Sequence, residues 1–298
     1  MIAGIQLRFP ALLLAAALLF PRTAGAAGQL APYKDDVFAY PGILSSADDG
    51  DYLVVDYREM RDINGRDTIP EKRVKAAYVS LDPMATQKDI FVDTPVARIA
   101  TMTAGRTEGA SMIVTYLHGQ GGSRQQGMDD WTFGGNFNRI KNLMTRNGGL
   151  YFTPDFSDFG DRGEAQVKGV IEHFAALSPG APVFVACGSM GGFICWKLAE
   201  DPEVAGRLSG LLLLGSMWDD KFLDSPAFRR RVPVFFGQGS HDVVFPIERQ
   251  EAFYRRIRAA APGYPTRFRR FETGTHGTPI RMTDWREVLN WMLGHPPR

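Results

Sequence analysis

An alternation of short apolar runs with helical patterns, beginning near residue 112, constrains the fold of this chain most. The runs are too short for core helices, and amphipathic spacing such as that of Val167, Val170, Ile171 and Phe174 marks helices between them. We expect strands at residues 112–117, 149–153, 182–186, 211–214, 232–236 and 267–271, and helices at 136–145, after Ser189, near 253–257 and at 285–292. This pattern predicts an α/β fold: a mostly parallel twisted sheet with helices on both faces.

The section before this alternation, residues 27–111, has a different pattern. Residues 51–57 and 74–81 are rich in Val and Tyr and are predicted as strands, and residues 89–101 as a strand pair that turns near Pro95. We therefore expect an antiparallel edge here, added to a core of residues 112–298. No linker or repeat divides the two sections, so residues 27–298 are predicted to form one domain.

The first 26 residues are typical of a signal peptide. Arg8 precedes an apolar run over residues 9–20, and Ala24-Gly25-Ala26 supplies a small-x-small cleavage site. A membrane anchor is the alternative, but the run falls short of the roughly 20 residues that a span needs, and Pro10 also opposes it. The prediction is an exported protein, periplasmic or secreted, whose mature form has no membrane span.

Composition excludes several classes of protein. The formal net charge is +1, so no overall field attracts nucleic acid. Cys187 and Cys195 are the two cysteines of the chain, which rules out a disulfide scaffold and a cysteine-based zinc site. Because a bridge between a strand end and the following helix is geometrically demanding, we expect two buried free thiols. No metal or cofactor is expected.

Ligands of parallel sheets bind beyond the carboxyl ends of the strands, so the residues that follow each strand are the candidates for a site. Gly188-Ser189-Met190-Gly191-Gly192 follows residues 182–186. A serine between small residues at a strand-to-helix turn is typical of a nucleophile elbow, which holds the hydroxyl near a helix N-terminus. The alternative is a glycine-rich turn with a capping serine.

A second loop, His118-Gly119-Gln120-Gly121-Gly122, follows residues 112–117. Its glycines allow backbone N–H groups to approach a substrate oxygen, so we predict the N–H groups of Gln120 and Met190 as oxyanion donors. A phosphate-binding loop is the alternative, but the Gly-Lys-Ser/Thr that would follow is absent. His118 precedes the turn and is predicted to be structural.

Asp242 and His276 complete a candidate catalytic triad. Asp242 follows residues 232–236 in the loop before a helix, and His276 lies in a glycine-bracketed loop after residues 267–271. The order Ser189, Asp242, His276 is that of hydrolases with a nucleophile elbow. The remaining histidines lack that position: His118 and His241 belong to loops, His173 to the polar face of a helix and His295 to the tail.

At these residues the chain resembles the α/β-hydrolase superfamily, most nearly its phospholipase/carboxylesterase and dienelactone-hydrolase-like branch. The resemblance covers residues 112–293 and implies the α/β-hydrolase fold, the triad, the two oxyanion amides and no cofactor. Cys187 departs from the pattern, because it replaces the first glycine of the elbow. The dienelactone enzymes use a cysteine nucleophile, so Ser189 argues against their substrate.

The predicted activity is hydrolysis of a carboxylic ester through an acyl-enzyme, with a small-molecule, lipid or sugar ester as substrate. A thioesterase, a serine peptidase and a non-catalytic binding protein of the same fold are alternatives. Trp131, Phe133 and Trp218 are candidates for the substrate pocket, and Asp155, Ser157, Asp158 and Asp161 for contacts to sugar hydroxyls or a cationic group. The sequence leaves the oligomeric state open.

Overall fold

A computed structural model of the chain describes Met1 and residues 29–68 and 73–298. Apart from Met1, the predicted signal peptide therefore lies outside the described residues.

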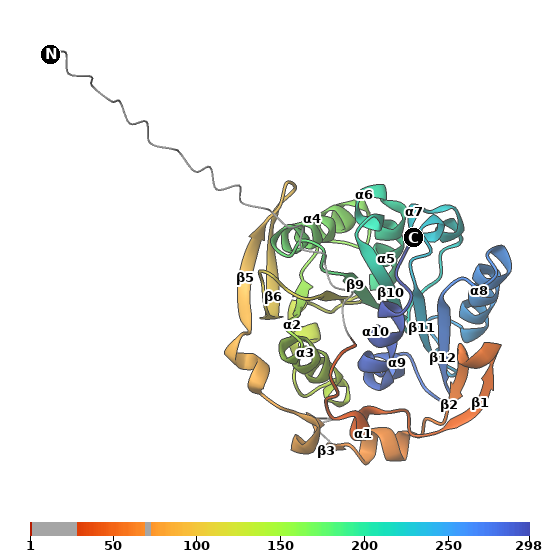
Figure 1. Cartoon of the computed structure of the whole chain (residues 1–298). Helices are drawn as coiled ribbons and strands as arrows, with labels where there is room; N and C mark the ends of the chain where they lie inside the picture. Colours follow the sequence, from red (N-terminus) through yellow and green to blue (C-terminus); the bar gives the residue numbers. More distant parts are fainter. Residues whose placement is uncertain (2–28, 69–72) are drawn as a thin grey trace.

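Ten strands of the described residues form one sheet, in the order β1-β2-β12-β11-β10-β9-β7-β8-β6-β5 (Figure 1). The strands are β1 Ile43–Ala47, β2 Tyr52–Val55, β5 Lys88–Asp93, β6 Arg98–Gly105, β7 Ile113–Leu117, β8 Leu150–Pro154, β9 Val183–Gly188, β10 Leu208–Leu214, β11 Val234–Gly239 and β12 Thr266–Phe271. Two further strands, β3 Asp67–Thr68 and β4 Arg73–Val74, pair with each other. From β2 to β8 every neighbouring pair is parallel, which confirms the predicted sheet.

The sheet is antiparallel at both edges. β1 pairs with β2 at one edge, and β6 pairs with β8 and β5 at the other. Of these strands, β1, β2, β5 and β6 come from the N-terminal section, so this section borders the parallel core on both sides. The predicted antiparallel edge is confirmed, and the second one follows from the strand pair that turns near Pro95.

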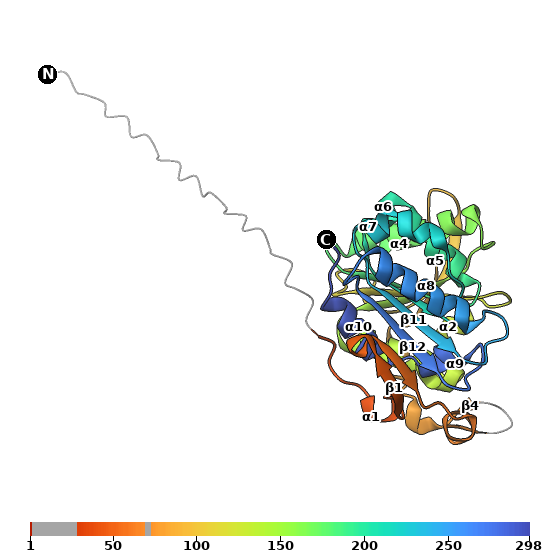
Figure 2. The same ribbon diagram turned by 90° about the vertical axis from the view of Figure 1, so that its right-hand side faces the viewer.

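Helices cover both faces of the sheet (Figure 2). They are α1 Asp35–Phe38, α2 Arg124–Met128, α3 Asn136–Arg146, α4 Asp161–Leu177, α5 Gly191–Glu200, α6 Pro202–Ala205, α7 Pro226–Arg229, α8 Ile247–Ala260, α9 Thr278–Met282 and α10 Trp285–Leu293. Helices α4 to α8 bury their apolar residues, Phe174 and Trp196 among them, in the core on one face. Helices α2, α3, α9 and α10 bury theirs, including Phe137 and Trp285, on the other face. Strands with both sides covered must be apolar throughout, and every residue of β9 is buried.

The strand predicted at residues 74–81 is wrong. Only Val74 belongs to a strand, and residues Ala76–Tyr78 form a 3-10 helix. The Val74 N–H donates to the carbonyl of Trp131, and the Tyr78 ring packs edge-on against Phe38. These contacts with distant segments outweigh the local β propensity.

Within residues 29–68 and 73–298, every helix is too short or too polar to reach across a bilayer.

Candidate active site

Ser189 lies at the sharp turn between β9 and α5. Its φ of 52° is in the left-handed region, which is uncommon for a residue with a side chain. The turn requires small neighbours: a side chain on Gly188 would overlap the Tyr116 hydroxyl, and one on Gly192 would overlap Oγ of Ser216. Strained backbone of this kind gathers at functional sites, and here it raises the serine hydroxyl above the carboxyl end of the sheet.

The structure brings Ser189, His276 and Asp242 into one hydrogen-bonded chain. Nε2 of His276 lies 2.9 Å from Oγ of Ser189, and Nδ1 lies 2.9 Å from Oδ2 of Asp242. The Asp242 side chain is fully buried, whereas the imidazole is 30% exposed. The imidazole can therefore accept a proton from the serine while the carboxylate orients the ring.

The loop after β7 lies directly against Ser189. A side chain on Gly119 would stand 2.6 Å from Cβ and 3.1 Å from Oγ of Ser189, so only glycine fits there. Next to it, the backbone N–H groups of Gln120 and Met190 donate to no protein acceptor in the part of the chain that the structure describes. Two unused donors beside a nucleophile are what an oxyanion hole requires.

Proteins of known structure share this architecture at low sequence identity. An Agrobacterium tumefaciens protein of unknown function, provisionally assigned to the α/β hydrolases, has a TM-score of 0.57 and 16% identity, over 71% of this chain and 99% of that one. An esterase of Pyrococcus furiosus has a TM-score of 0.54 and 14% identity, over 72% and 94% of the two chains. An α/β serine hydrolase without a lid, from Xanthomonas campestris, gives 0.50 and 16%, over 70% and 94%.

The chain has the α/β-hydrolase fold. No protein-family model matches its sequence, and a search of curated proteins finds no match either. Likeness at this level of identity establishes the fold alone.

In this α/β-hydrolase fold the carboxylate of Asp242 is held from several directions. Oδ1 accepts hydrogen bonds from the N–H groups of Val244 at 2.8 Å and Phe245 at 3.0 Å. Oδ2 accepts from Nε2 of Gln238 at 2.7 Å as well as from His276. Gln238 is not predicted from the sequence, because it lies inside β11 and contacts Asp242 only because the following loop folds back toward the strand.

Ser216 is a second residue that the sequence analysis missed. Its hydroxyl donates a 2.6 Å hydrogen bond to the backbone carbonyl of Ser189, and its own carbonyl accepts one from Gln250. Ser216 comes directly after β10, at the edge of the sheet where functional residues were sought. Its position after β10 could therefore have identified it as a candidate site residue.

His118 stands outside the hydrogen-bonded chain, as predicted. Its ring stacks on Phe156 at 4.3 Å between centroids, and Nδ1 lies 2.9 Å from the carbonyl of Gly119. Burial lowers the pKa of the His118 imidazole, which favours the neutral form. Its contacts support the oxyanion loop rather than the serine.

The three predicted pocket residues are placed differently. Phe133 is half-buried and approaches Gly277, the neighbour of His276. Trp131 is covered by the guanidinium of Arg73, 3.9 Å from its ring, and Trp218 is half-buried and packs against the core on the face of α4 to α8. Phe245, which was not predicted, lies 5.7 Å from the His276 ring.

The polar residues after β8 have partners within the protein. Asp155 pairs with Arg124 at 2.5 Å, and Asp161 pairs with Lys197 at the same distance. Asp158 accepts from Ser157 and from the backbone of the turn that precedes α4. These side chains stabilise loops, and nothing in their contacts favours a role in binding sugar.

The expectation of two free thiols is wrong, because Cys187 and Cys195 form a disulfide. Cys187 lies in β9 two residues before Ser189, and Cys195 lies in α5 six residues after it. The tight elbow turns α5 back over the end of β9, which brings the two buried side chains together. The alternation of strand and helix in the sequence does not determine whether the two cysteine side chains come close enough to form a bond.

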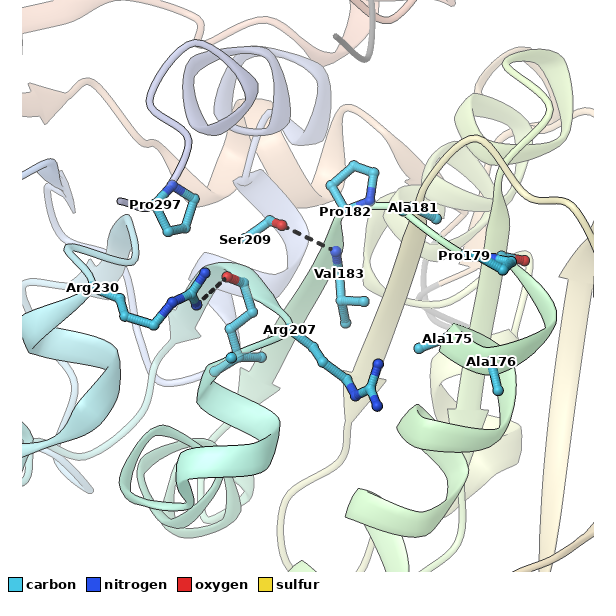
Figure 3. Close-up of a pocket in the computed structure, with 14 residues that line it drawn as sticks. Ala175, Ala176, Pro179, Ala181, Pro182, Val183, Arg207, Ser209, Arg230 and Pro297 are labelled. Carbon is cyan, nitrogen blue, oxygen red and sulfur yellow. Dashed lines mark hydrogen bonds between the residues drawn. The ribbon is translucent and has the colours of Figure 1, made fainter. Parts of the chain in front are cut away.

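Two further features concern ligands. A hollow of about 510 Å³ lies between the amino ends of β9 and β10, with Arg207, Ser209 and Arg230 among its lining residues (Figure 3). It is at the end of the sheet opposite Ser189, so it does not belong to the triad.

Among the described residues, no group of three His, Cys, Asp or Glu side chains is arranged to hold a metal ion.

Proposed function

We propose that this chain is an exported serine hydrolase that cleaves carboxylic esters, with Ser189 as nucleophile, His276 as general base and Asp242 as the acid that orients it. The observation that carries the proposal is the hydrogen-bonded chain from Asp242 through His276 to Ser189, with both distances at 2.9 Å. A scaffold would have no need to hold a buried carboxylate, an imidazole and a strained serine in this order.

The mechanism follows from the geometry. His276 takes the proton of the Ser189 hydroxyl as Oγ attacks the ester carbonyl, and the N–H groups of Gln120 and Met190 bind the oxyanion. His276 then gives the proton to the alcohol oxygen, the bond from carbon to that oxygen breaks, and the alcohol leaves. Water attacks the acyl-enzyme with His276 as base, which releases the carboxylic acid and restores Ser189.

Thioester and amide hydrolysis are alternatives on the same site. The triad suits both, because each passes through a tetrahedral oxyanion. No observation on the described residues favours either of them over ester hydrolysis. Matched ester, thioester and amide substrates distinguish the three activities.

Export is the second part of the proposal, and it rests on the leader pattern of residues 1–26. The disulfide between Cys187 and Cys195 supports it, because such bonds persist mainly in oxidising compartments. Expression with the leader, followed by mass measurement of the N-terminal peptide outside the cytoplasm, tests cleavage after Ala26.

A fluorophosphonate probe tests the enzyme claim. We expect the probe to label Ser189 and no other residue, with Ser189→Ala as the unlabelled control, and the labelled peptide identified by mass spectrometry. Hydrolysis of matched p-nitrophenyl esters, thioesters and aminoacyl anilides then separates the three activities. Ser189→Ala should lower kcat at least about 10⁴-fold. A folded protein that neither reacts with the probe nor hydrolyses any of these substrates would contradict the proposal.

A further inference from the structure

We infer that the part of the site that receives the alcohol of the ester is apolar, and that Phe133 and Phe245 make the enzyme selective for esters of hydrophobic alcohols over esters of polyols. This inference rests on the proposed function and deepens it, because it names the substrate class. The Phe245 ring lies beside the His276 ring and Phe133 approaches Gly277, the next residue, and that location decides which half of the substrate they meet.

His276 marks the alcohol side of the site. The proton that its Nε2 takes from Ser189 has to be delivered to the departing alcohol oxygen, which must come within hydrogen-bond reach of that nitrogen. The carbon atoms attached to this oxygen then lie beside the imidazole. Side chains around the ring therefore contact the alcohol, whereas the acyl group lies on the other side of the scissile bond.

Phe245 supplies one wall of this region. Its ring is half-buried, with its centroid 5.7 Å from that of His276. The backbone is fixed, because the Phe245 N–H donates to Asp242 and its carbonyl accepts from Gln238 at 2.8 Å. Val243 and Val244 precede it and are 93% and 52% exposed. Phe245 therefore adds an apolar ring beside His276 at the end of a run of three apolar residues, and exposed apolar groups in a cluster mark contact surfaces.

Phe133 supplies the other wall. Its Cε1 lies 3.7 Å from the point that a side chain on Gly277 would occupy, and its ring packs edge-on against Phe137 at 5.6 Å. The φ of Phe133 is 48°, and Gly134 and Gly135 after it also have positive φ. A left-handed phenylalanine is strained, and such strain is retained where the position of a side chain matters.

The chemistry of the two walls selects the alcohol. Phenyl rings cannot replace the hydrogen bonds that water makes to glycerol or a sugar, so a polyol loses solvation without compensation. An aryl or branched alkyl alcohol buries its surface at no such cost.

Acetates that differ only in the alcohol test the inference. We expect kcat/KM for benzyl acetate and 3,3-dimethylbutyl acetate to exceed that for glyceryl acetate at least about tenfold. A p-nitrophenyl series of increasing acyl length measures the acyl side separately.

Variants assign the selectivity to residues. Phe245→Ala and Phe133→Asn should each lower the ratio of kcat/KM for benzyl to glyceryl acetate about tenfold, and Phe245→Leu should restore part of the loss. Asparagine is chosen because it tolerates a positive φ. Phe91→Ala is the matched control, since Phe91 is an exposed phenylalanine on the edge strand β5 and should leave the ratio unchanged.

Two results would overturn the inference while the enzyme remains an esterase. One is a wild-type preference for glyceryl acetate. The other is a pair of phenylalanine variants that alter the acyl-length profile but not the alcohol ratio. Absence of both probe labelling and ester hydrolysis would instead contradict the proposed function, and this inference with it.

Discussion

Gln238 donates a hydrogen bond to Oδ2 of Asp242, the same carboxylate oxygen that accepts from Nδ1 of His276. The two distances are 2.7 and 2.9 Å, and both Gln238 and Asp242 are buried. The amide and the imidazole therefore share one oxygen, and the charge that Asp242 presents to His276 depends on Gln238.

Replacing Gln238 should alter the rate and its pH dependence. In Gln238→Leu the carboxylate loses a donor that fixes its position and shares its charge, so kcat/KM should fall roughly ten- to a hundredfold and the acid limb of the pH–rate profile should shift to higher pH. Gln166→Leu is the control, since Gln166 is also buried but bonds to Ser157. A fall in rate with an unshifted profile would indicate that Gln238 has only a structural role.

Gly119→Ala should impair the site without unfolding the protein. The added methyl would stand 2.6 Å from Cβ of Ser189, so the oxyanion loop or the serine must move. Displacement on this scale lowers kcat/KM about 10²-fold. Gly294→Ala, whose nearest neighbour is 3.4 Å away, serves as control. Steady-state kinetics beside thermal unfolding measure both effects, and a fully active Gly119→Ala enzyme would contradict the predicted contact.

Removing the disulfide should destabilise the protein. The bond closes a loop with a sequence separation of 8, for which chain entropy gives about 2–3 kcal/mol. We expect the double variant Cys187→Ala/Cys195→Ala to unfold at lower urea concentration than the parent. A reductant should lower the midpoint of the parent and leave that of the variant unchanged. A parent chain insensitive to reductant throughout unfolding would show that the bond does not form.

The buried pair of Arg281 and Asp67 should be important for stability. Two hydrogen bonds of 3.0 and 2.8 Å join them, and the Asp67 side chain is fully buried. Asp67→Ala leaves a buried guanidinium without its partner, so the free energy of unfolding should fall by about 3–5 kcal/mol. The double variant Asp67→Leu/Arg281→Met should lose less, because no charge stays buried. Urea unfolding of the single and double variants tests this, and equal losses would refute it.

Acidification should weaken the fold through His118. Burial lowers the pKa of His118 from its ordinary value of 6.5, so below that pH the unfolded chain takes up a proton that the folded chain resists. The contribution of neutral His118 to the free energy of unfolding is therefore fully present above pH 6.5. It falls as the pH drops through 6.5 toward the lowered pKa. His118→Phe keeps a ring on Phe156 but cannot titrate, and it should lose less stability between pH 7.5 and pH 5.5 in urea unfolding. An equal loss in both proteins would exclude His118 as the cause.

Much of the fold could be predicted from the sequence, because buried parallel strands have to be apolar and their carboxyl ends have to meet. That rule, together with the small residues around Ser189 and the order of the three residues in the chain, predicts Ser189, Asp242 and His276, which the structure brings together. Residues 74–81 were mispredicted because contacts with Trp131 and Phe38, far away in the sequence, decide their conformation.

The parts of the site that could not be predicted depend on the path of the loop after β11 and on the direction in which α5 leaves the turn at Ser189. Gln238 faces Asp242 because the loop between them turns back on β11, and Phe245 reaches His276 through the same loop. The disulfide depends on the angle at which α5 leaves the elbow. None of these relationships has a periodic signal, since each is fixed by backbone geometry rather than by burial.

The N-terminal section borders both edges of the parallel sheet, and this has a consequence for synthesis on the ribosome. Asp51, next to β2, bonds to Arg267 in β12, which is translated 216 residues later. At a typical 5–20 residues per second, β2 waits about 10–40 s for its neighbour. During that interval an apolar strand edge is open to other chains. Chaperones that shield this edge until β12 arrives should therefore raise the yield of folded protein.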